Sequence, residues 1–374
     1  MRPRSLAVVV SSLGFGFGCG QAPTRETPTP TPAPPSLTTF AYAETDVPGT
    51  LRVFDVDDET GALRTRIDVT PSGTEQAPVV SPGSFAVDPN GRFLFYSYDS
   101  CRGGFCGNVS SYEILPDGGL RLLVHDGPES LEAGIEVFFA TASRLVTHWD
   151  DPPWHSLTFY DFDGYGGLKR NGGIFLGYGY GNVPRRFELT RNGRWGYGLT
   201  TGRLVSYRLD ERPGNLETST QTLPAPGRGL EMDTRERLLY VSLQTTPPRI
   251  DVYGISDAGL GSVVGTTPVG EAGPLLLDPT ERLLFLGGSA GIEIYSVDPG
   301  TGLLLPRGRE PVDGLDGLSV HPFGTFLYAS LEDGSLRGYA IDPSTGALSD
   351  IGLGARGRRL QFARVPATTG RGGA

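Results

Sequence analysis

The sequence predicts an all-β protein, a seven-bladed β-propeller with four antiparallel strands in each blade. One strand motif with a central aromatic residue occurs seven times, mostly with a period in the forties, which is typical of propeller blades. A turn motif precedes most of these strands. Among 374 residues, 55 are glycine and 31 are proline, which favours many turns over long helices.

The aromatic motif alternates apolar and other residues, as expected for the third strand of a blade. Its copies are Leu51–Asp57, Val109–Leu115, Leu157–Asp163, Leu204–Asp210, Ile250–Ser256, Ile292–Asp298 and Leu336–Asp342. The aromatic residues are Phe54, Tyr112, Tyr160, Tyr207, Tyr253, Tyr295 and Tyr339. The fourth strand follows turns such as Asp57–Gly61.

The turn motif joins the inner strand of a blade to its second strand. In Val87–Phe95, Asp-Pro-Asn-Gly supplies a tight turn, because proline fixes φ and glycine accepts a positive φ. Further copies are Leu189–Tyr197, Met232–Tyr240, Leu277–Phe285 and Val320–Tyr328, with a weaker one at Phe139–Thr147.

The first blade lacks an inner strand, since no turn motif precedes its second strand, Thr39–Tyr42. The missing strand is present at the other end of the chain, as Arg359–Val365. We therefore expect the C-terminal strand to complete the first blade, so that residues 38–365 form one closed ring without open sheet edges between its ends.

The N-terminal residues 1–18 are expected to be a signal peptide: Arg2 and Arg4 precede an apolar stretch, Leu6–Phe17, that is too short to span a bilayer. Cys19 follows, and the segment resembles a bacterial lipoprotein signal, which implies lipidation of this cysteine. An ordinary cleaved secretory signal is the alternative. The expected location is the outer membrane or periplasm, or outside the cell if the protein is secreted.

Residues 19–37 are rich in proline and threonine and should form an extended tether, and residues 366–374 a disordered tail. Cys101 and Cys106 are expected to form a disulfide, since an even pair in an exported protein favours one. Closing so short a loop with a disulfide stabilises the folded state by roughly 2 kcal/mol. Zinc would need further thiol or imidazole ligands nearby, and none follow at suitable spacing.

The net charge of −10 and the absence of a basic cluster with interleaved aromatics argue against nucleic acid as a partner. We expect a monomer that touches the membrane only through a lipid on Cys19. The expected ligand is a protein or a carbohydrate.

The turn and strand motifs resemble lactonase-type seven-bladed propellers, the family that contains a bacterial 6-phosphogluconolactonase. The similarity is strongest over Ser319–Leu348 and covers nearly all of residues 38–365. It implies the propeller fold, and it implies that any enzymatic site would use His, Arg and Glu groups that converge on the central channel. The shared motifs are structural, so no catalytic residue transfers by position.

In a propeller, the loops between second and third strands lie at one mouth of the channel, where ligands usually bind. The segment Thr147–His155 is expected to be such a loop. Its Trp149 and Trp154 could stack on a sugar or anchor a partner. The catalytic candidates there are His148, Asp150, Asp151 and His155, as possible base and orienting groups. Alternatively, the loop only covers neighbouring blades.

A second candidate segment follows on the same face. Tyr178 and Tyr180 could add an aromatic rim, and Arg185 and Arg186 could hold a carboxylate or phosphate, with a surface ion pair as the alternative.

Three other patterns are expected to carry no chemistry. Ser289, in Gly-Gly-Ser-Ala-Gly, should lie in a hairpin and not in the strand-to-helix elbow of a nucleophilic serine. His321 occurs in a turn motif on the opposite face and should be structural. No metal or cofactor motif is present, and the Cys-x-x-Cys-His haem attachment sequence is missing.

The sequence thus predicts an exported, lipid-anchored propeller that binds a ligand at its channel mouth. The alternative is a lactone hydrolase, in which an imidazole or carboxylate activates water and an arginine stabilises the oxyanion.

Replacing Cys19 by Ala should abolish lipid attachment, because the thiol is the atom that would carry the lipid. In bacteria fed radiolabelled palmitate, the wild-type protein should be labelled and the C19A variant should not. Equal labelling of both proteins would contradict the lipoprotein hypothesis.

Overall fold

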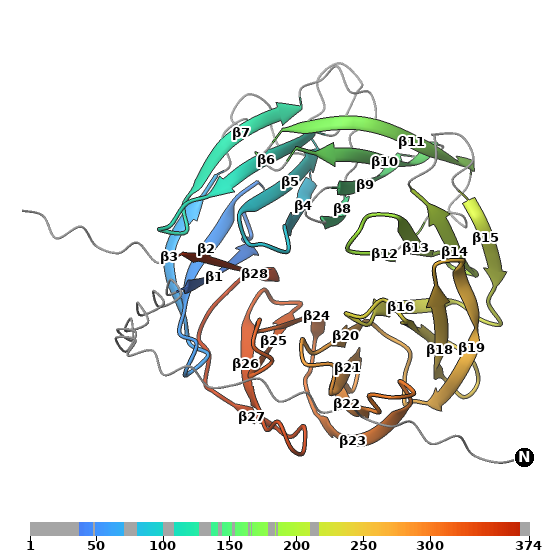
Figure 1. The fold of residues 1–374 in the computed structure, drawn as a ribbon. Helices are drawn as coiled ribbons and strands as arrows, with labels where there is room; N and C mark the ends of the chain where they lie inside the picture. Colours follow the sequence, from blue (N-terminus) through green and yellow to red (C-terminus); the bar gives the residue numbers. More distant parts are fainter. Residues whose placement is uncertain are drawn as a thin grey trace, which may run out of the picture. The chain divides into compact units, whose positions relative to one another are not determined.

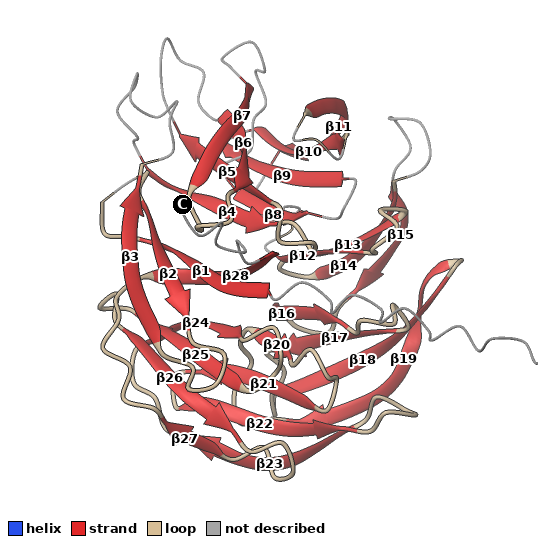
Figure 2. Ribbon diagram, turned by 60° about the vertical axis from the view of Figure 1, so that its left-hand side comes forward, coloured by secondary structure: helices blue, strands red, loops and turns tan. Residues whose placement is uncertain are grey.

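The structure is a computed structural model that describes residues 37–47, 49–70, 81–99, 108–126, 136–140, 144–151, 154–163, 165, 167–178, 184, 186–209 and 217–366. In these ranges every regular element is a strand (Figure 2), and seven four-stranded sheets surround a central channel (Figure 1). The predicted seven-bladed propeller is confirmed. The described part of the chain contains no helix with the length and apolarity needed to cross a membrane.

The predicted signal peptide, Cys19, all but the last residue of the tether, and the Cys101–Cys106 pair lie outside the described residues. The ring itself begins at Leu37 and ends at Pro366, one residue beyond each predicted bound.

The first three blades each run from the inner strand outward. Blade 1 contains β28 (Arg358–Pro366), β1 (Leu37–Glu44), β2 (Leu51–Val56) and β3 (Leu63–Val69). Blade 2 contains β4 (Ser81–Val87), β5 (Phe93–Asp99), β6 (Asn108–Ile114) and β7 (Leu120–Asp126). Blade 3 contains β8 (Glu136–Ala140), β9 (Arg144–Asp151), β10 (Trp154–Phe162) and β11 (Leu168–Tyr178).

The other four blades follow the same order. Blade 4 contains β12 (Arg186–Leu189), β13 (Trp195–Leu199), β14 (Arg203–Arg208) and β15 (Glu217–Thr222). Blade 5 contains β16 (Gly227–Met232), β17 (Leu238–Leu243), β18 (Arg249–Ser256) and β19 (Gly259–Pro268). Blade 6 contains β20 (Leu275–Leu277), β21 (Leu283–Gly288), β22 (Gly291–Val297) and β23 (Leu304–Glu310). Blade 7 contains β24 (Leu315–Val320), β25 (Phe326–Leu331), β26 (Leu336–Ile341) and β27 (Leu348–Asp350).

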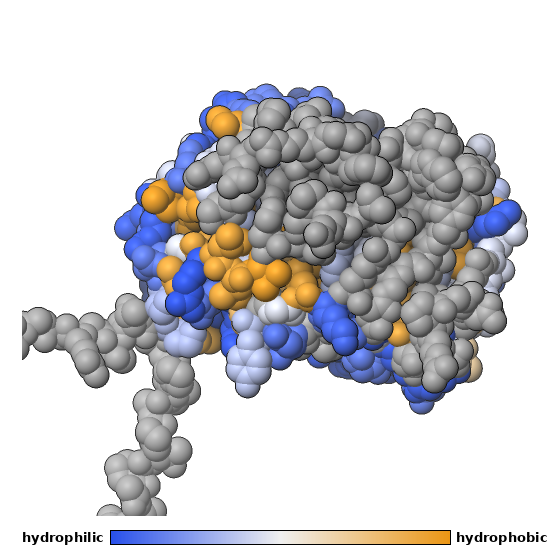
Figure 3. All heavy atoms as spheres, turned by 90° about the horizontal axis from the view of Figure 1, so that it is seen from above, coloured by the Kyte–Doolittle hydropathy of each residue, from blue (hydrophilic) through white to orange (hydrophobic). Residues whose placement is uncertain are grey.

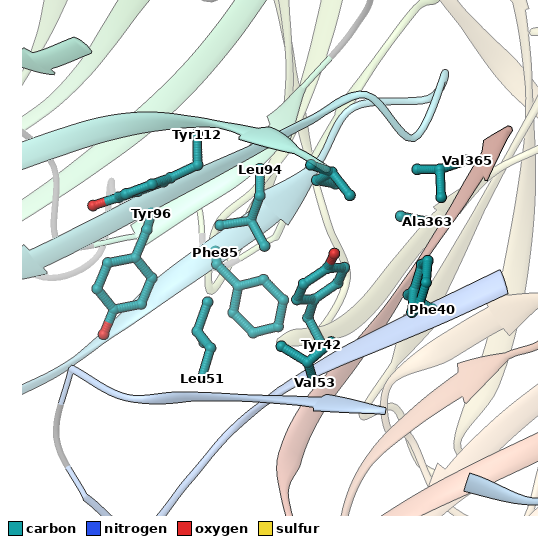
Figure 4. Close-up of a cluster of buried hydrophobic side chains, with 11 residues drawn as sticks. Phe40, Tyr42, Leu51, Val53, Phe85, Leu94, Tyr96, Tyr112, Ala363 and Val365 are labelled. Carbon is teal, nitrogen blue, oxygen red and sulfur yellow. The ribbon is translucent and has the colours of Figure 1, made fainter. Parts of the chain in front are cut away.

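The two ends of the ring pair in blade 1, as predicted from the missing inner strand. β28 lies antiparallel to β1, with Leu37 opposite Pro366 and Phe40 opposite Ala363. The β28 side chains of Ala363 and Val365 join Phe40, Tyr42 and residues of blade 2 in one buried cluster (Figure 4). The C-terminal strand therefore closes the ring and also fills the core between blades 1 and 2.

The repeated aromatic residue of each third strand is buried in all seven blades. In blades 1 to 6 a shift in register between the third and fourth strands falls directly before it, for example between Val53 and Phe54. Such bulges increase the local twist of a strand pair. The aromatic motif thus marks where the outer edge of the blade twists.

Adjacent blades meet where a turn glycine of one blade packs on the preceding blade. In the turn between β6 and β7, Gly118 has a φ of 78°, and a Cβ there would lie 2.6 Å from the ring of Phe40 in the second strand of blade 1. The Tyr42 hydroxyl donates to the Gly118 carbonyl at 2.8 Å. The corresponding pairs are Gly61 with Phe326, Gly259 with Trp195, Gly302 with Leu238 and Gly346 with Leu283.

The turn between inner and second strands is held by its first polar residue. In blade 2, the Asp88 carboxylate accepts hydrogen bonds from the amides of Arg92 and Phe93 at 2.6 and 2.7 Å. Asp233 and Asp278 do the same in blades 5 and 6.

The fourth turn residue differs between blades. Gly91, Gly193 and Gly324 occupy it with positive φ, and so do Glu236 and Glu281, each at a φ of 57°. Non-glycine residues rarely adopt this conformation. Each of the two carboxylates accepts a hydrogen bond from the turn of the preceding blade: Glu236 from the Arg191 amide, and Glu281 from the Thr234 amide.

Where that preceding turn carries proline at the same place, as Pro279 does before Gly324, there is no amide to bind and the next blade has glycine. The glutamates therefore link neighbouring turns only where a donor exists.

The outer wall of the ring carries some exposed apolar side chains, and Figure 3 shows apolar residues gathered on part of it among hydrophilic ones. The fourth strands contribute Ile67, Val263, Val264 and Leu305, each 43–62% exposed. Exposed apolar side chains occur on the surfaces of most folded proteins.

Deleting residues 357–374 should prevent stable folding, because it removes β28. Burial of Leu360, Ala363 and Val365 would be lost, at a cost of about 5 kcal/mol or more, comparable with the whole stability of many domains. Thermal unfolding by circular dichroism measures this. Deleting only 367–374 is the control and should change little; equal melting of the two truncated proteins would contradict the closure.

Replacing Gly118 by Ala should destabilise the fold by about 2–4 kcal/mol, from backbone strain together with overlap against Phe40. Gly352 is a matched control, since its φ is 69° but nothing lies within 4 Å of the added Cβ. In chemical denaturation, the free energy of unfolding of G352A should fall only by the cost of the backbone strain, roughly 1 kcal/mol. Equal losses in both variants would show that the blade contact contributes nothing.

Candidate functional site

A cavity of about 410 Å³ opens at one mouth of the central channel. It lies where inner strands begin and second strands end, which is the face predicted for the site. This volume is within the range of small-molecule sites. Its walls come from six inner strands (Figure 1), with Ser330 of β25 beside them. The lining residues are Ser84, Phe85, Arg186, Phe187, Glu188, Leu230, Glu231, Pro274, Leu275, Asp316, Gly317, Leu318, Ser319, Ser330, Arg359, Leu360 and Gln361.

Five of these lining residues are ionisable. Arg186, Asp316 and Arg359 are exposed to the channel mouth, whereas Glu188 and Glu231 are half-buried deeper in the wall. Arg359 has a φ of 52°, a strained conformation for this residue, and its guanidinium lies 3.8 Å from the Glu44 carboxylate. The cavity thus offers cations and carboxyl groups to a polar ligand.

The two glutamates are held partly uncharged by their surroundings. Burial raises the pKa of Glu231 to about 8, although the Leu277 amide, which donates to this carboxyl, acts in the opposite direction. Burial also raises the pKa of Glu188 well above its usual range, and the negative charge of Glu231 raises it further, while Arg186 opposes the shift. Near neutral pH the pair therefore retains a proton.

Glu188 and Glu231 occupy one repeated position, the inner-strand residue opposite an aromatic of the second strand. Glu188 lies opposite Tyr197 and Glu231 opposite Tyr240. The same position holds Gln361, Ala86, Leu276 and Ser319 in blades 1, 2, 6 and 7. Glu188, Glu231, Gln361 and Ser319 also line the cavity, and we call the six residues at this repeated position the girdle residues.

Sequence reasoning missed Glu188, Glu231, Asp316 and Arg359, because it searched the loops. One signal could have found the two glutamates. Arg-Phe-Glu-Leu and Gly-Leu-Glu-Met place a single acid in a short apolar inner strand, where the repeat directs it toward the channel.

Of the predicted site residues, Arg186 is the one that the described structure brings into the cavity. Arg185 and Tyr180 lie outside the described residues. Tyr178 ends β11, and its backbone pairs with that of Trp154. Trp154 and Tyr178 are therefore neighbours on adjacent strands of blade 3.

The predicted loop Thr147–His155 is instead mostly strand. β9 runs to Asp151 and β10 starts at Trp154, so that Asp151 pairs with Trp154 and Asp150 with His155. His148 lies opposite Leu157, and Trp149 opposite Ser156. Aromatic residues and threonine favour strands, so the ladder continues almost to the prolines. The structure does not describe the side chains of this hairpin end.

His321 and Ser289 have structural contacts, as expected. The His321 ring is fully buried among Phe323, Phe326 and Phe362, and its Nε2 lies 3.0 Å from Asp58 Oδ1. Burial lowers its pKa. Ser289 lies in the hairpin between β21 and β22, and its amide and hydroxyl both donate to Glu271 at 2.7 Å. Neither residue lines the cavity.

No group of three or more His, Cys, Asp and Glu side chains within the described part of the chain is placed to hold a metal ion. The charged groups of the cavity can instead bind hydroxyl, carboxyl or phosphate oxygens directly, and its carboxyl pair can both donate and accept a proton.

No family model and no curated protein matches the sequence. Solved structures do match. One is a protein from Bacteroides fragilis described as a "putative 6-phosphogluconolactonase", 16% identical, with a TM-score of 0.69, covering 88% of this chain and 98% of that one. A protein of the same description from Bacteroides uniformis is 15% identical, with a TM-score of 0.70 and coverage of 87% and 99%. A Lactobacillus plantarum protein is 14% identical, with a TM-score of 0.66 and coverage of 87% and 99%. At these identities the similarity confirms the predicted resemblance at the level of the fold.

Proposed function

We propose that the protein is a small-molecule binding propeller whose ligand occupies the channel-mouth cavity. The observation that carries this is the convergence of Arg186, Arg359, Glu188 and Glu231 on one cavity of about 410 Å³. A concave polar site of this size suits a single small molecule better than a protein surface. Export and a lipid anchor remain part of the proposal and rest on the N-terminal sequence.

The charges of the cavity favour a hydroxyl-rich ligand that also bears an oxyanion or a carbonyl. Arginine guanidinium groups bind carboxylate or carbonyl oxygens with directed hydrogen bonds. Carboxyl groups that share a proton can accept from some hydroxyls and donate to others. Sugar acids and their lactones combine these features. Trp149, Trp154 and Tyr178, on the tip of blade 3, are proposed as an outer aromatic rim.

Hydrolysis of a lactone is the second candidate function, and the carboxyl pair favours it. An ionised carboxylate could activate water as a general base, and an arginine could stabilise the oxyanion that develops on the carbonyl oxygen. The bond between the carbonyl carbon and the ring oxygen would break, and the ring oxygen would take up the proton that the carboxylate removed from water. The description of the two Bacteroides neighbours agrees with this chemistry, but only their fold is shared at the observed identity.

Arg186→Ala should weaken ligand binding at least about tenfold, because a hydrogen bond to a charged group would be lost. Calorimetric titration with a panel of aldonic acids and sugar lactones measures this. Arg307, an exposed residue of β23 outside the cavity, gives the matched control R307A, which should bind as the wild type does. A ligand that binds R186A and wild type equally would place the site elsewhere.

Measuring the release of acid from the same lactones distinguishes the two functions. If the protein is a hydrolase, Glu188→Gln should lower kcat by roughly a hundredfold or more, as expected for loss of a general base. If the wild type binds a lactone tightly but does not hydrolyse it, the hydrolase function is ruled out and only the binding function remains.

A further inference from the structure

The girdle residues include a clamp between inner strands of adjacent blades. In blade 1, Gln361 Nε2 donates to the Phe85 carbonyl of β4 at 2.8 Å, and its Oε1 accepts from the Val87 amide at 2.9 Å. One side chain therefore satisfies a carbonyl and an amide of the next blade, two residues apart, as a neighbouring strand would.

A simpler clamp is present between blades 7 and 1. The girdle residue Ser319 donates from its hydroxyl to the Leu360 carbonyl at 2.6 Å. Leu360 precedes the girdle residue of blade 1, just as Phe85 precedes Ala86 in blade 2. Both clamps thus donate a proton to the same repeated carbonyl.

Glu231 stands in this position in blade 5. Its carboxyl accepts from the Leu277 amide of β20, which is the counterpart of Val87. The counterpart of the Phe85 carbonyl belongs to Leu275, and both Leu275 and Glu231 line the cavity. A carboxylate cannot donate to that carbonyl, whereas a carboxylic acid can do so and has nearly the shape of glutamine.

We infer that Glu231 is a positioning residue that acts as a neutral carboxylic acid: one oxygen accepts from the Leu277 amide and the other donates to the Leu275 carbonyl, so that blade 5 is clamped to blade 6 as Gln361 clamps blade 1 to blade 2. The inference holds whichever ligand the cavity takes.

The surroundings of Glu231 agree with this assignment. Arg186 and Glu188 of β12, Asp316 of β24 and Arg359 of β28 line the same cavity as Glu231, while β20 contributes only leucines. Burial raises the pKa of Glu231 from 4.5 to about 8, and the Leu277 amide acts in the opposite direction. A raised pKa means that the stabilisation is complete below about 4.5 and is lost as the pH increases through about 8.

The proton on Glu231 also determines the state of Glu188. A neutral Glu231 puts no negative charge beside Glu188, whereas an ionised Glu231 raises the pKa of Glu188 further. When Glu231 loses its proton, the carbonyl of Leu275 also loses its donor. The clamp therefore fixes both the position and the charge of the carboxyl that faces the ligand.

The test compares E231Q, E231A and the reciprocal variant Q361E in full-length protein. Chemical denaturation midpoints would be measured from about pH 5 to about pH 9, a range that brackets the titration. E231Q should equal the wild type in acid and exceed it in base, because the amide donates at every pH. E231A should be less stable than E231Q throughout, and Q361E should lose more stability in base than the wild type does, because it places a second ionisable clamp in the ring.

A spectroscopic measurement tests the proton itself. The carbonyl stretch of a protonated carboxyl group should be present in infrared difference spectra of the wild type near neutral pH and should disappear in E231Q. The inference is overturned if E231Q is as unstable as E231A in acid, if its pH dependence equals that of the wild type, or if no protonated carboxyl is removed by the substitution.

Discussion

The seam between neighbouring blades is the contact on which this ring depends. A turn glycine of one blade lies against an apolar residue of the second strand of the preceding blade, as Gly118 lies against Phe40 and Gly61 against Phe326. A side chain larger than hydrogen would push the blades apart, and the positive φ of these turns excludes most other residues as well. Because the seams set how closely the inner strands approach, they also set the width of the channel and of the cavity at its mouth.

The fold could be predicted because each repeat contains the residues that form its turns and mark its strands. Asp88 and its counterparts make the same hydrogen bonds in several turns, and an aromatic such as Tyr112 marks every third strand. Closure of the ring could be predicted because blade 1 lacks an inner strand in its own repeat, and Arg359–Val365 is a strand that belongs to no other blade. Such information is local in sequence and needs no knowledge of distances.

The site was harder to predict, because it exists only after closure. Arg186 was predicted from its place after a loop, and it does line the cavity. Glu188 and Glu231 interact only when two inner strands bring them together in a confined space. The sequence of a single repeat does not show this pairing. His148 and His155 were predicted as site residues from their residue types, yet their segment extends the β9–β10 ladder instead of forming a long loop. Composition identifies reactive groups, whereas three-dimensional convergence decides which of them can act together.

The turn glutamates have a consequence for how the ring is assembled. Glu236 and Glu281 have a strained backbone with positive φ. Their carboxylates accept hydrogen bonds from an amide that only certain preceding turns possess. A blade that follows a proline-bearing turn would find nothing for such a carboxylate to bind. Blades 4, 5 and 6 are therefore not interchangeable copies, because exchanging their order would remove these two hydrogen bonds between neighbouring turns.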